Sequence, residues 1–459
     1  MPRKLPLQGR EISIGSGTLC SEYSASLLRS LGAGVFSTAE VSALDAARDW
    51  AYSGLVPLTG YADSPMQGPG AIPSAASGAL DALKLLAGKG YLADLNGARL
   101  LSERAAFLQL DRQGQTSANG SCHLIPAADG WIALNLARKD DWDLMPAWLQ
   151  CSMEICTWTT VTEQVGRQPV SRLLERGRLL GLPIASADEP PASPDAWFSV
   201  SRGVPASIGS RPRPLVIDLS SLWAGPLCTH LLQRAGARVI KVESEKRPDA
   251  ARLGNSDFFN LLNGGKESVA LDFSRGEGRR QFLALLSKAD IVVESSRPRA
   301  LEQLGIVADE VIKSTPGLTW VSLTGHGRDQ PGGNWVAFGD DAAVAAGVAA
   351  ATARPPVFCG DALADPLTGI HAALAAFAYW QNGGGVLLDL SLTQVTAYCL
   401  SSFSGFERGS IVSSKGAWRL QWREHSFEVS APAIRPPLAA AHAPGSDTGA
   451  VLDEFQIQC

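Results

Sequence analysis

The stretch that begins at Leu215, LVIDLSSLWAGPLCTHLLQRAGARVIKVESE, constrains the fold of this chain most, because it has the pattern of a βαβ unit. An apolar strand leads to a turn at Ala224-Gly225-Pro226, then to a helix and to a second apolar strand that ends at Glu243. A unit of this kind opens a parallel sheet covered by helices. The turn has no GxGxxG phosphate loop, so a nicotinamide or flavin cofactor is not indicated.

Length and charge narrow the class of protein further. The chain has 459 residues, which is enough for two or three domains, and a formal net charge of -5. This net charge does not indicate the basic surface that binds nucleic acid. The start, MPRKLPLQGR, lacks the apolar core of a signal peptide, and the most apolar stretches are short and rich in small residues. We therefore expect neither a nucleic-acid partner nor a membrane partner.

The cysteines and histidines suggest no metal centre. Eight cysteines are scattered without a CxxC pair, and six histidines form no cluster of ligands. Reduced thiols in the cytoplasm are the simplest interpretation, and we expect no structural metal.

The chain repeats itself weakly. LCSEYSASLLRSLGAGVFSTAE, from position 19, and LCTHLLQRAGARVIKVESE, from position 227, share Leu-Cys, an apolar helix, a Gly-Ala stop and a short strand. Around Gly78 and Gly369, a helix leads through a glycine turn into a strand that ends in Asp-Leu, at Asp94 and Asp389. Chance similarity of two common βα units is the alternative, but two matches in the same order favour a degenerate duplication. The first copy is shorter and lacks the middle strands.

A later stretch, PPVFCGDALADPLTGIHAALAAFAYW, places Asp365 just before a long Ala-rich helical run. Together with the βαβ unit, it resembles the family III CoA-transferases of the CaiB/BaiF type. This family includes formyl-CoA transferase, carnitine-CoA transferase and 2-methylacyl-CoA racemase. The resemblance covers residues 215–400 closely and 123–208 more loosely. It implies an α/β fold with a Rossmann-like large domain of parallel sheet, a smaller α+β domain and, in this rearranged member, a degenerate N-terminal copy of the large domain.

The small domain of the family has a counterpart between the two copies. HLIPAADGWIALNLARKDDWDLMPAWL, from His123, alternates like a strand over 131–136 and then becomes helical, and VTEQVGRQPVSRLLERGRLLGLPIASADEPP adds two helices and a strand. A linker from Pro190-Pro191 to Pro214 follows. We therefore expect a degenerate large-domain-like repeat (1–114), a small domain (115–208), a CoA-binding large domain (209–400) and a C-terminal extension that returns to the large domain (401–459).

Asp365 is the expected catalytic residue. The resemblance implies transfer of CoA between an acyl-CoA thioester and a carboxylic acid through a covalent aspartyl intermediate. A carboxylate attacks a thioester to give an anhydride and then receives CoA itself, which divides one hard exchange into easier steps. From local sequence alone, an Asp before Pro366 is ordinarily a helix cap. The family motif D-xxx-G-xx-A, which aligns with Asp365 and Gly369, favours the nucleophile. The first copy has Ser74 at the matching position.

The resemblance also implies a CoA crevice at the ends of successive strands. Coenzyme A or acyl-CoA would be a substrate, and no permanently bound cofactor is expected. Lysine and arginine can pair with the phosphates of CoA, and glycine lets the backbone approach them closely. Taken singly, a lysine or arginine is more often a solvated surface charge. The expected CoA-binding residues are Ser220, Ala224, Gly225, Glu243, Asn263, Lys266, Ser296, Arg297 and Arg299.

Departures from the family pattern affect the expected chemistry. Asp340, in Gly339-Asp340-Asp341, stands where racemases have histidine. Racemisation needs two positioned acid/base groups, and two carboxylates serve poorly at neutral pH. Trp223 replaces a polar residue beside the acyl group, which favours a bulkier apolar acyl group over formate or oxalate. His326 is interpreted as a loop residue and not as a base. The alternatives are an inactive CoA-binding scaffold and an acyl-CoA hydrolase or racemase.

The repeat predicts an unusual assembly. Family members resemble interlocked homodimers whose sites lie between two subunits. With two large-domain copies, this chain forms an internal pseudo-dimer, and its single small domain closes over Asp365 of the same chain. One CoA site per monomer is expected; a homodimer with a shared site is the alternative.

Overall fold

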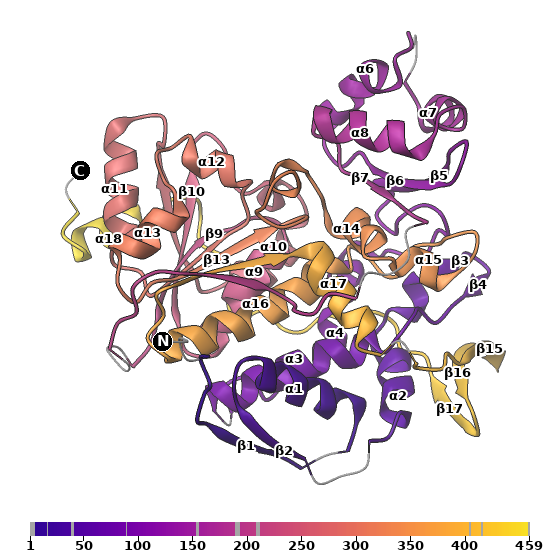
Figure 1. Ribbon diagram of the computed structural model, residues 1–459, viewed down its shortest axis with the longest axis horizontal. Helices are drawn as coiled ribbons and strands as arrows, with labels where there is room; N and C mark the ends of the chain where they lie inside the picture. Colours follow the sequence, from indigo (N-terminus) through magenta and orange to yellow (C-terminus); the bar gives the residue numbers. More distant parts are fainter. Residues whose placement is uncertain are drawn as a thin grey trace.

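A seven-stranded sheet forms the centre of the large domain in the computed structural model (Figure 1). The strand order is β11-β10-β9-β12-β13-β14-β8, and every pair is parallel except β14 with β8. The strands are β8 (Ser199–Arg202), β9 (Leu215–Leu219), β10 (Arg238–Ser244), β11 (Glu267–Leu271), β12 (Ile291–Glu294), β13 (Thr319–Thr324) and β14 (Val386–Ser391). The structure describes residues 5–15, 17–37, 41–88, 90–152, 156–188, 193–207, 212–403, 405–414 and 416–457.

The βαβ unit expected from Leu215 is confirmed. β9 leads into α9 (Ala224–Arg234) and then into β10, and the two strands pair in parallel. Gly225 is required because a Cβ there would lie 2.1 Å from the Cβ of Ser220. β9 and β12 are almost entirely buried, as expected for strands covered by helices on both faces.

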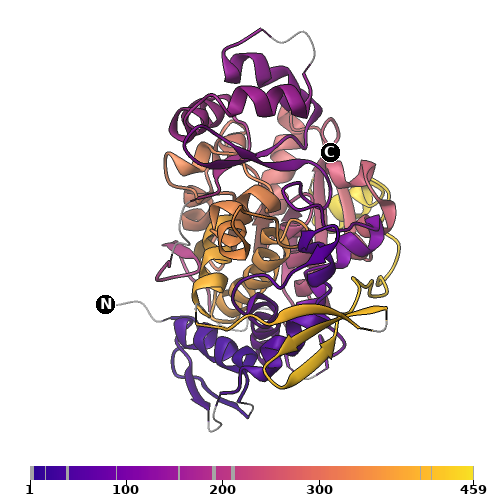
Figure 2. The same cartoon turned by 90° about the vertical axis from the view of Figure 1, so that its right-hand side faces the viewer.

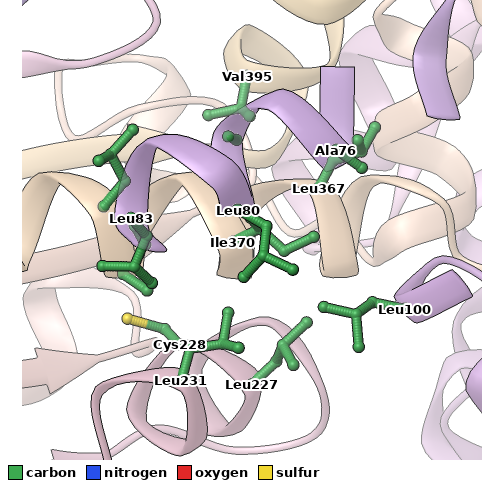
Figure 3. Packing of buried hydrophobic residues seen from close by; sticks show 14 of the residues in the cluster. Ala76, Leu80, Leu83, Leu100, Leu227, Cys228, Leu231, Leu367, Ile370 and Val395 are labelled. Atoms are coloured by element: carbon green, nitrogen blue, oxygen red, sulfur yellow. The ribbon is translucent and has the colours of Figure 1, made fainter. Parts of the chain in front are cut away.

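The long helix α16 (Ala364–Gln381) is the core of the molecule. Its residues are buried on nearly every face, because it packs between α9 and the N-terminal helix α3 (Ile72–Ala87). Figure 3 shows Leu80 and Leu83 of α3 beside Ile370 of α16, with α9 below them. The remaining helices of this half are α10 (Ser256–Asn263), α11 (Gly276–Leu286), α12 (Pro298–Glu302), α13 (Ala308–Ser314), α14 (Gly339–Ala345), α15 (Val348–Thr352), α17 (Leu392–Ser401) and α18 (Thr448–Glu454).

The N-terminal region begins with a small βαβ unit of its own. The strands β1 (Glu11–Ile14) and β2 (Gly34–Ser37) pair in parallel around α1 (Leu19–Ser30). The expected strand at Asp94-Leu95 is wrong, because residues 91–94 form a turn. The other elements are α2 (Leu44–Tyr52), β3 (Gly60–Tyr61), β4 (Ser64–Pro65), α4 (Gly97–Leu100) and α5 (Glu103–Leu108).

The helices α1 and α9 end in the same way. Gly32 after α1 has φ +98° and Gly236 after α9 has φ +100°, and each next residue donates its N–H to a carbonyl five positions earlier. An added Cβ on Gly78 would meet the carbonyl oxygen of Cys20 at 2.5 Å, and one on Gly369 would meet that of Ala224 at 2.5 Å. In this packing contact Cys20 occupies the place that Ala224 occupies in the other, whereas the Leu-Cys alignment in the sequence pairs Cys20 with Cys228, one helical turn later.

The small domain lies at the opposite end of the molecule from β1 and β2, as Figures 1 and 2 show. The expected strand, two helices and final strand are present, and the domain has its own apolar core around Trp148. Its elements are β5 (Cys122–Pro126), β6 (Trp131–Asn135), α6 (Met145–Leu149), α7 (Trp158–Val165), α8 (Val170–Leu180) and β7 (Ile184–Ser186).

The linker and the C-terminal segment contain more structure than the sequence indicates. The linker includes β8, a polar edge strand of the large sheet, whereas Pro190 and Pro191 lie outside the described residues. In the C-terminal segment, β15 (Ser410–Ser414), β16 (Ala417–Trp422) and β17 (His425–Glu428) form a separate antiparallel sheet against α2. α18 then packs on β11.

Candidate active site

Asp365 lies where the N-termini of two helices meet. It is in the first turn of α16, and its carboxylate accepts a hydrogen bond from the backbone N–H of Ala224, the first residue of α9. Asp365 is not the cap of α16, because the N-cap position is Leu363. Helix N-termini carry partial positive charge and favour an anion. Ala224 therefore contacts the carboxylate itself.

Gly339, the first residue of α14, lies directly against Asp365. A Cβ at Gly339 would come within 2.3 Å of Asp365 Oδ2 and 2.4 Å of the carbonyl oxygen of Ala362. Such distances exclude any side chain unless α14 moves. Gly339 thus fixes the separation between α14 and the start of α16.

Four aspartates gather at this position. Asp340, Asp341 and Asp361 are 4%, 0% and 0% exposed, whereas Asp365 keeps a partly exposed side chain. Burial raises the pKa of Asp365 to about 7, and Arg104 opposes this shift. Burial also raises the pKa of Asp341 to about 7, and burial together with Asp361 raises that of Asp340 to about 6. Asp365 is thus the most exposed of the four.

Residues from outside the large domain hold the other aspartates. Asn119 Nδ2 donates to Asp340 Oδ2 at 3.0 Å, and Asn135 Nδ2 of β6 donates to Asp341 Oδ1 at 3.0 Å. Arg104 of α5 donates from Nε to Asp361 Oδ2 at 2.7 Å. These three contacts join the N-terminal region and the small domain to the surroundings of Asp365.

Trp223 is 1% exposed and precedes Ala224, so its indole lies beside the start of α9. The guanidinium carbon of Arg104 lies 5.3 Å from the centroid of its ring, and Phe258 contacts it edge-on at 5.4 Å. The ring of Trp223 therefore contacts both Arg104 and Phe258.

Two non-glycine residues with left-handed backbone flank the site. Leu222 has φ +70° and comes just before Trp223, and Ala362 has φ +43° and donates its N–H to Asp340 Oδ1 at 2.8 Å. Such conformations cost about 1–3 kcal/mol each and concentrate at functional sites. Their positions on both sides of Asp365 are typical of a site whose strained backbone is stabilised by the surrounding structure.

Several expected CoA-binding residues are structural. Lys266 is 1% exposed, and its Nζ donates to Asp218 Oδ2 at 2.9 Å, Thr229 Oγ1 at 2.8 Å and Asn263 Oδ1 at 3.0 Å. Both Lys266, expected to pair with phosphate, and Asn263, expected to contact CoA, have their side chains bonded inside the core, and their contact with CoA stays a prediction. The side chain of Ser220 likewise donates to Asp218.

Glu243 is also part of the framework. Its carboxylate pairs with Arg252, with Nη2 and Oε2 2.6 Å apart, and accepts the N–H of Asp249 at 2.9 Å. Gly225 lies under Ser220, as described above. These contacts shape the turn around α9, and the expected roles of Glu243 and Gly225 in CoA binding stay predictions.

Arginines gather instead near the end of β12. The pKa of Arg297 is lowered by burial and then by the neighbouring charges of Arg299, Arg138 and Arg247. Arg138 belongs to the small domain, and Nη1 of Arg297 would lie 3.9 Å from a Cβ on Gly181, after α8. Mutual repulsion of this kind is relieved by an anion, and guanidinium groups suit phosphate. Arg138 and Arg247 were missed, because nothing local in the sequence links them to the loop after β12.

Neither a metal site nor a membrane span is found in the described residues. No group of three or more His, Cys, Asp or Glu side chains there is arranged to hold a metal ion. Within the same ranges, none of the helices combines the length and apolarity needed to cross a bilayer.

The fold and the site together define an α/β protein in which the Asp365 carboxylate meets the start of α9, the helix that follows the carboxyl end of β9 in a parallel sheet. Residues 214–409 match CoA-transferase family III. This match confirms, for that region, the resemblance seen in the sequence.

Two curated relatives illustrate the similarity. An acyl-CoA transferase from Fusarium pseudograminearum is 33% identical over 209 residues, which cover 41% of this chain and 46% of the relative. A succinyl-CoA–D-citramalate CoA-transferase from Chloroflexus aurantiacus is 31% identical over 199 residues, or 39% of this chain and 50% of the relative. The chain thus spans about half the length of the curated relatives that it matches. A solved structure of Rv3272 from Mycobacterium tuberculosis is 30% identical, with a TM-score of 0.38 and coverage of 42% of this chain and 55% of that chain.

Proposed function

We propose that this protein transfers CoA between an acyl-CoA thioester and a carboxylic acid through a covalent intermediate on Asp365. One observation carries the proposal: Asp365, the most exposed of the four aspartates, accepts the N–H of Ala224 through its carboxylate at the meeting point of two helix N-termini. The family match of residues 214–409 and the names of the relatives, which act on acyl-CoA, succinyl-CoA and D-citramalate, support it.

The reaction begins with the ionised carboxylate of Asp365. One carboxylate oxygen attacks the thioester carbonyl carbon, the C–S bond breaks, and CoA leaves as the thiolate, which leaves a mixed anhydride on Asp365. The thiolate then attacks the aspartyl carbonyl carbon, so the donor acid leaves as a carboxylate and CoA is held as an aspartyl thioester. The acceptor carboxylate repeats these steps in reverse, which yields the new acyl-CoA and restores Asp365. The N–H of Ala224 stabilises negative charge on the attacked aspartyl group.

The CoA moiety is proposed to extend from Asp365 toward the arginines after β12. Arg297 and Arg299 supply positive charge at that edge, and Arg138 of the small domain and Arg247 lie close enough to Arg297 to act on its charge. Ser296 remains a candidate contact in the same loop, where its N–H donates to Glu294. The buried ring of Trp223 favours an apolar acyl group over formate.

The N-terminal region is proposed to be a degenerate second copy of the large domain. The equivalent ends of α1 and α9 support this, as do the matching close approaches at Gly78 and Gly369. The packing of α3 on α16, visible in Figure 3, would be the interface of an internal pseudo-dimer. One chain would then form one CoA site, with a homodimer as the alternative. A cytoplasmic location, in keeping with seven free cysteines among the described residues, belongs to the same proposal.

Two measurements test this proposal. Asp365→Asn is expected to abolish exchange of CoA between acyl-CoA and free acid, whereas Ser74→Ala, at the matching position of the first copy, is expected to keep it. CoA binding followed by calorimetry should show one molecule per chain for both variants. Wild-type exchange in Asp365→Asn would overturn the covalent mechanism, and two CoA per chain would overturn the assignment of one site.

A further inference from the structure

We infer that Arg104, which lies outside the family-matched region, is a positioning residue for the reaction at Asp365: it holds Asp361 and supplies the positive charge that favours the ionised form of the nucleophile. The inference rests on the proposed function. It gives the N-terminal region a definite role in the chemistry, because Arg104 is supplied by α5 and the other charged groups of the site come from residues 340–365.

The geometry of Arg104 is that of a fixed charge. Nε and Nη2 donate to the two oxygens of Asp361, with an Nε to Oδ2 distance of 2.7 Å, and the guanidinium faces the ring of Trp223. The Arg104 side chain is 23% exposed and Asp361 is fully buried. The preceding residue, Glu103, pairs with Arg435 at 2.8 Å, which anchors the start of α5. A two-point contact of this type fixes orientation as well as charge.

The charge of Arg104 acts on three carboxylates at once. Its pKa is lowered by burial but raised overall by Asp361, then by Asp340 and Asp365. Around Asp365, Asp340 and Asp361 favour the protonated form, and Arg104 is the positive side chain that opposes them. Without Arg104, these carboxylates would share a partly buried space without a counter-ion, and Asp365 would take up a proton at a higher pH.

The other titratable groups on the helices and strands packed around this site interact with other partners. Asp341 of α14 raises the pKa of Cys122 of β5, and its own pKa is raised by burial and by Asp340. On α9, Cys228 faces Asp218, and His230 faces Arg435. On α3, Asp81 lies against Cys20, and on α17, Cys399 contacts Tyr23. The charged groups that shift the pKa of Asp365 are therefore Arg104, Asp340 and Asp361.

The loss of Arg104 is tested by the pH dependence of the first half-reaction. Acetyl-CoA or succinyl-CoA, labelled in the acyl group, is mixed with the protein without an acceptor acid, and the burst of free acetate or succinate that accompanies formation of the aspartyl thioester is measured from pH 5 to pH 9. In Arg104→Gln we expect the acidic limb of the rate profile to move upward by about one pH unit, which is about a tenfold lower rate at pH 6. Arg104→Lys should restore part of the shift. Arg112→Gln, which removes an arginine bonded to the carbonyls of Tyr61 and Ala62, should leave the profile unchanged.

A double variant separates electrostatics from folding. Arg104→Gln with Asp361→Asn replaces both partners by neutral amides, so the acidic limb should return toward that of the wild type even though Arg104 is absent. An unshifted profile in a folded Arg104→Gln protein, or a shift that persists unchanged in the double variant, contradicts the role of Arg104. No burst from the wild type with either thioester, or an equal burst from Asp365→Asn, contradicts instead the proposed function.

Discussion

Gly369 of α16 lies directly against the carbonyl oxygen of Ala224 in α9. A Cβ added at Gly369 would come within 2.5 Å of that oxygen. The same two helices form the hydrogen bond between Ala224 and Asp365, one turn earlier on α16. The close packing at Gly369 therefore sets the position of the nucleophile relative to the N–H group that it uses.

The first prediction follows from this contact. Gly369→Ala should reduce the free energy of unfolding by about 1–3 kcal/mol, because α16 must move away from α9. It should also slow CoA exchange in the folded protein, since the Ala224 contact to Asp365 is lost. Gly78→Ala introduces the same clash between α3 and α1 and should cost similar stability with a smaller loss of rate. Gly449→Ala in α18, where an added Cβ meets nothing within 4 Å, is the control. Equal rate losses in both buried variants would contradict the special position of Gly369.

The acidic group predicts how stability changes with pH. The pKa of Asp341 is raised by burial to about 7, from an ordinary value near 4, so the folded protein binds a proton that the unfolded chain releases. Its contribution to stability is therefore complete below about pH 4 and is lost as the pH rises through 7, with a slope of up to about 1.4 kcal/mol per unit. Denaturant unfolding of Asp341→Asn from pH 4 to 8 should show a flatter profile than the wild type. An identical slope in both proteins would contradict the protonated state of Asp341.

The basic loop after β12 predicts where CoA binds. Arg297→Ala and Arg299→Ala should each weaken CoA binding by about tenfold, and the loss should shrink at high salt. The exposed Arg280 of α11 provides a matched control, and Arg280→Ala should bind CoA normally. Unchanged affinity in both loop variants would place the phosphates elsewhere.

Lys266 is expected to behave differently from these arginines. Lys266→Met removes one partner of a buried ion pair, so it should destabilise the fold by about 3–5 kcal/mol, as measured by denaturant unfolding. CoA affinity per folded molecule should change little. A stable Lys266→Met protein that has lost CoA binding would restore Lys266 as a phosphate ligand.

The sequence predicts the parts of this structure that depend on local pattern. The βαβ unit from Leu215 follows from alternation and glycine placement, and the position of Asp365 at a helix start follows from its motif. The role of Lys266 could not be read in the same way, because its burial depends on Asp218, which lies on a different strand. Arg104 gave no local signal either, since its partner Asp361 is far away in the chain. The polar strand β8 was missed because an exposed edge strand lacks apolar alternation.

The covalent role of Asp365 is tested most directly by locating the intermediate. After incubation with acyl-CoA and rapid acid quenching, the protein is digested and its peptides are weighed by mass spectrometry. We predict that the peptide containing Asp365 gains the mass of CoA less one water, that hydroxylamine removes this addition, and that Asp365→Asn shows no gain. Sustained CoA exchange with no adduct on this peptide, or with an adduct on another peptide, would contradict the account.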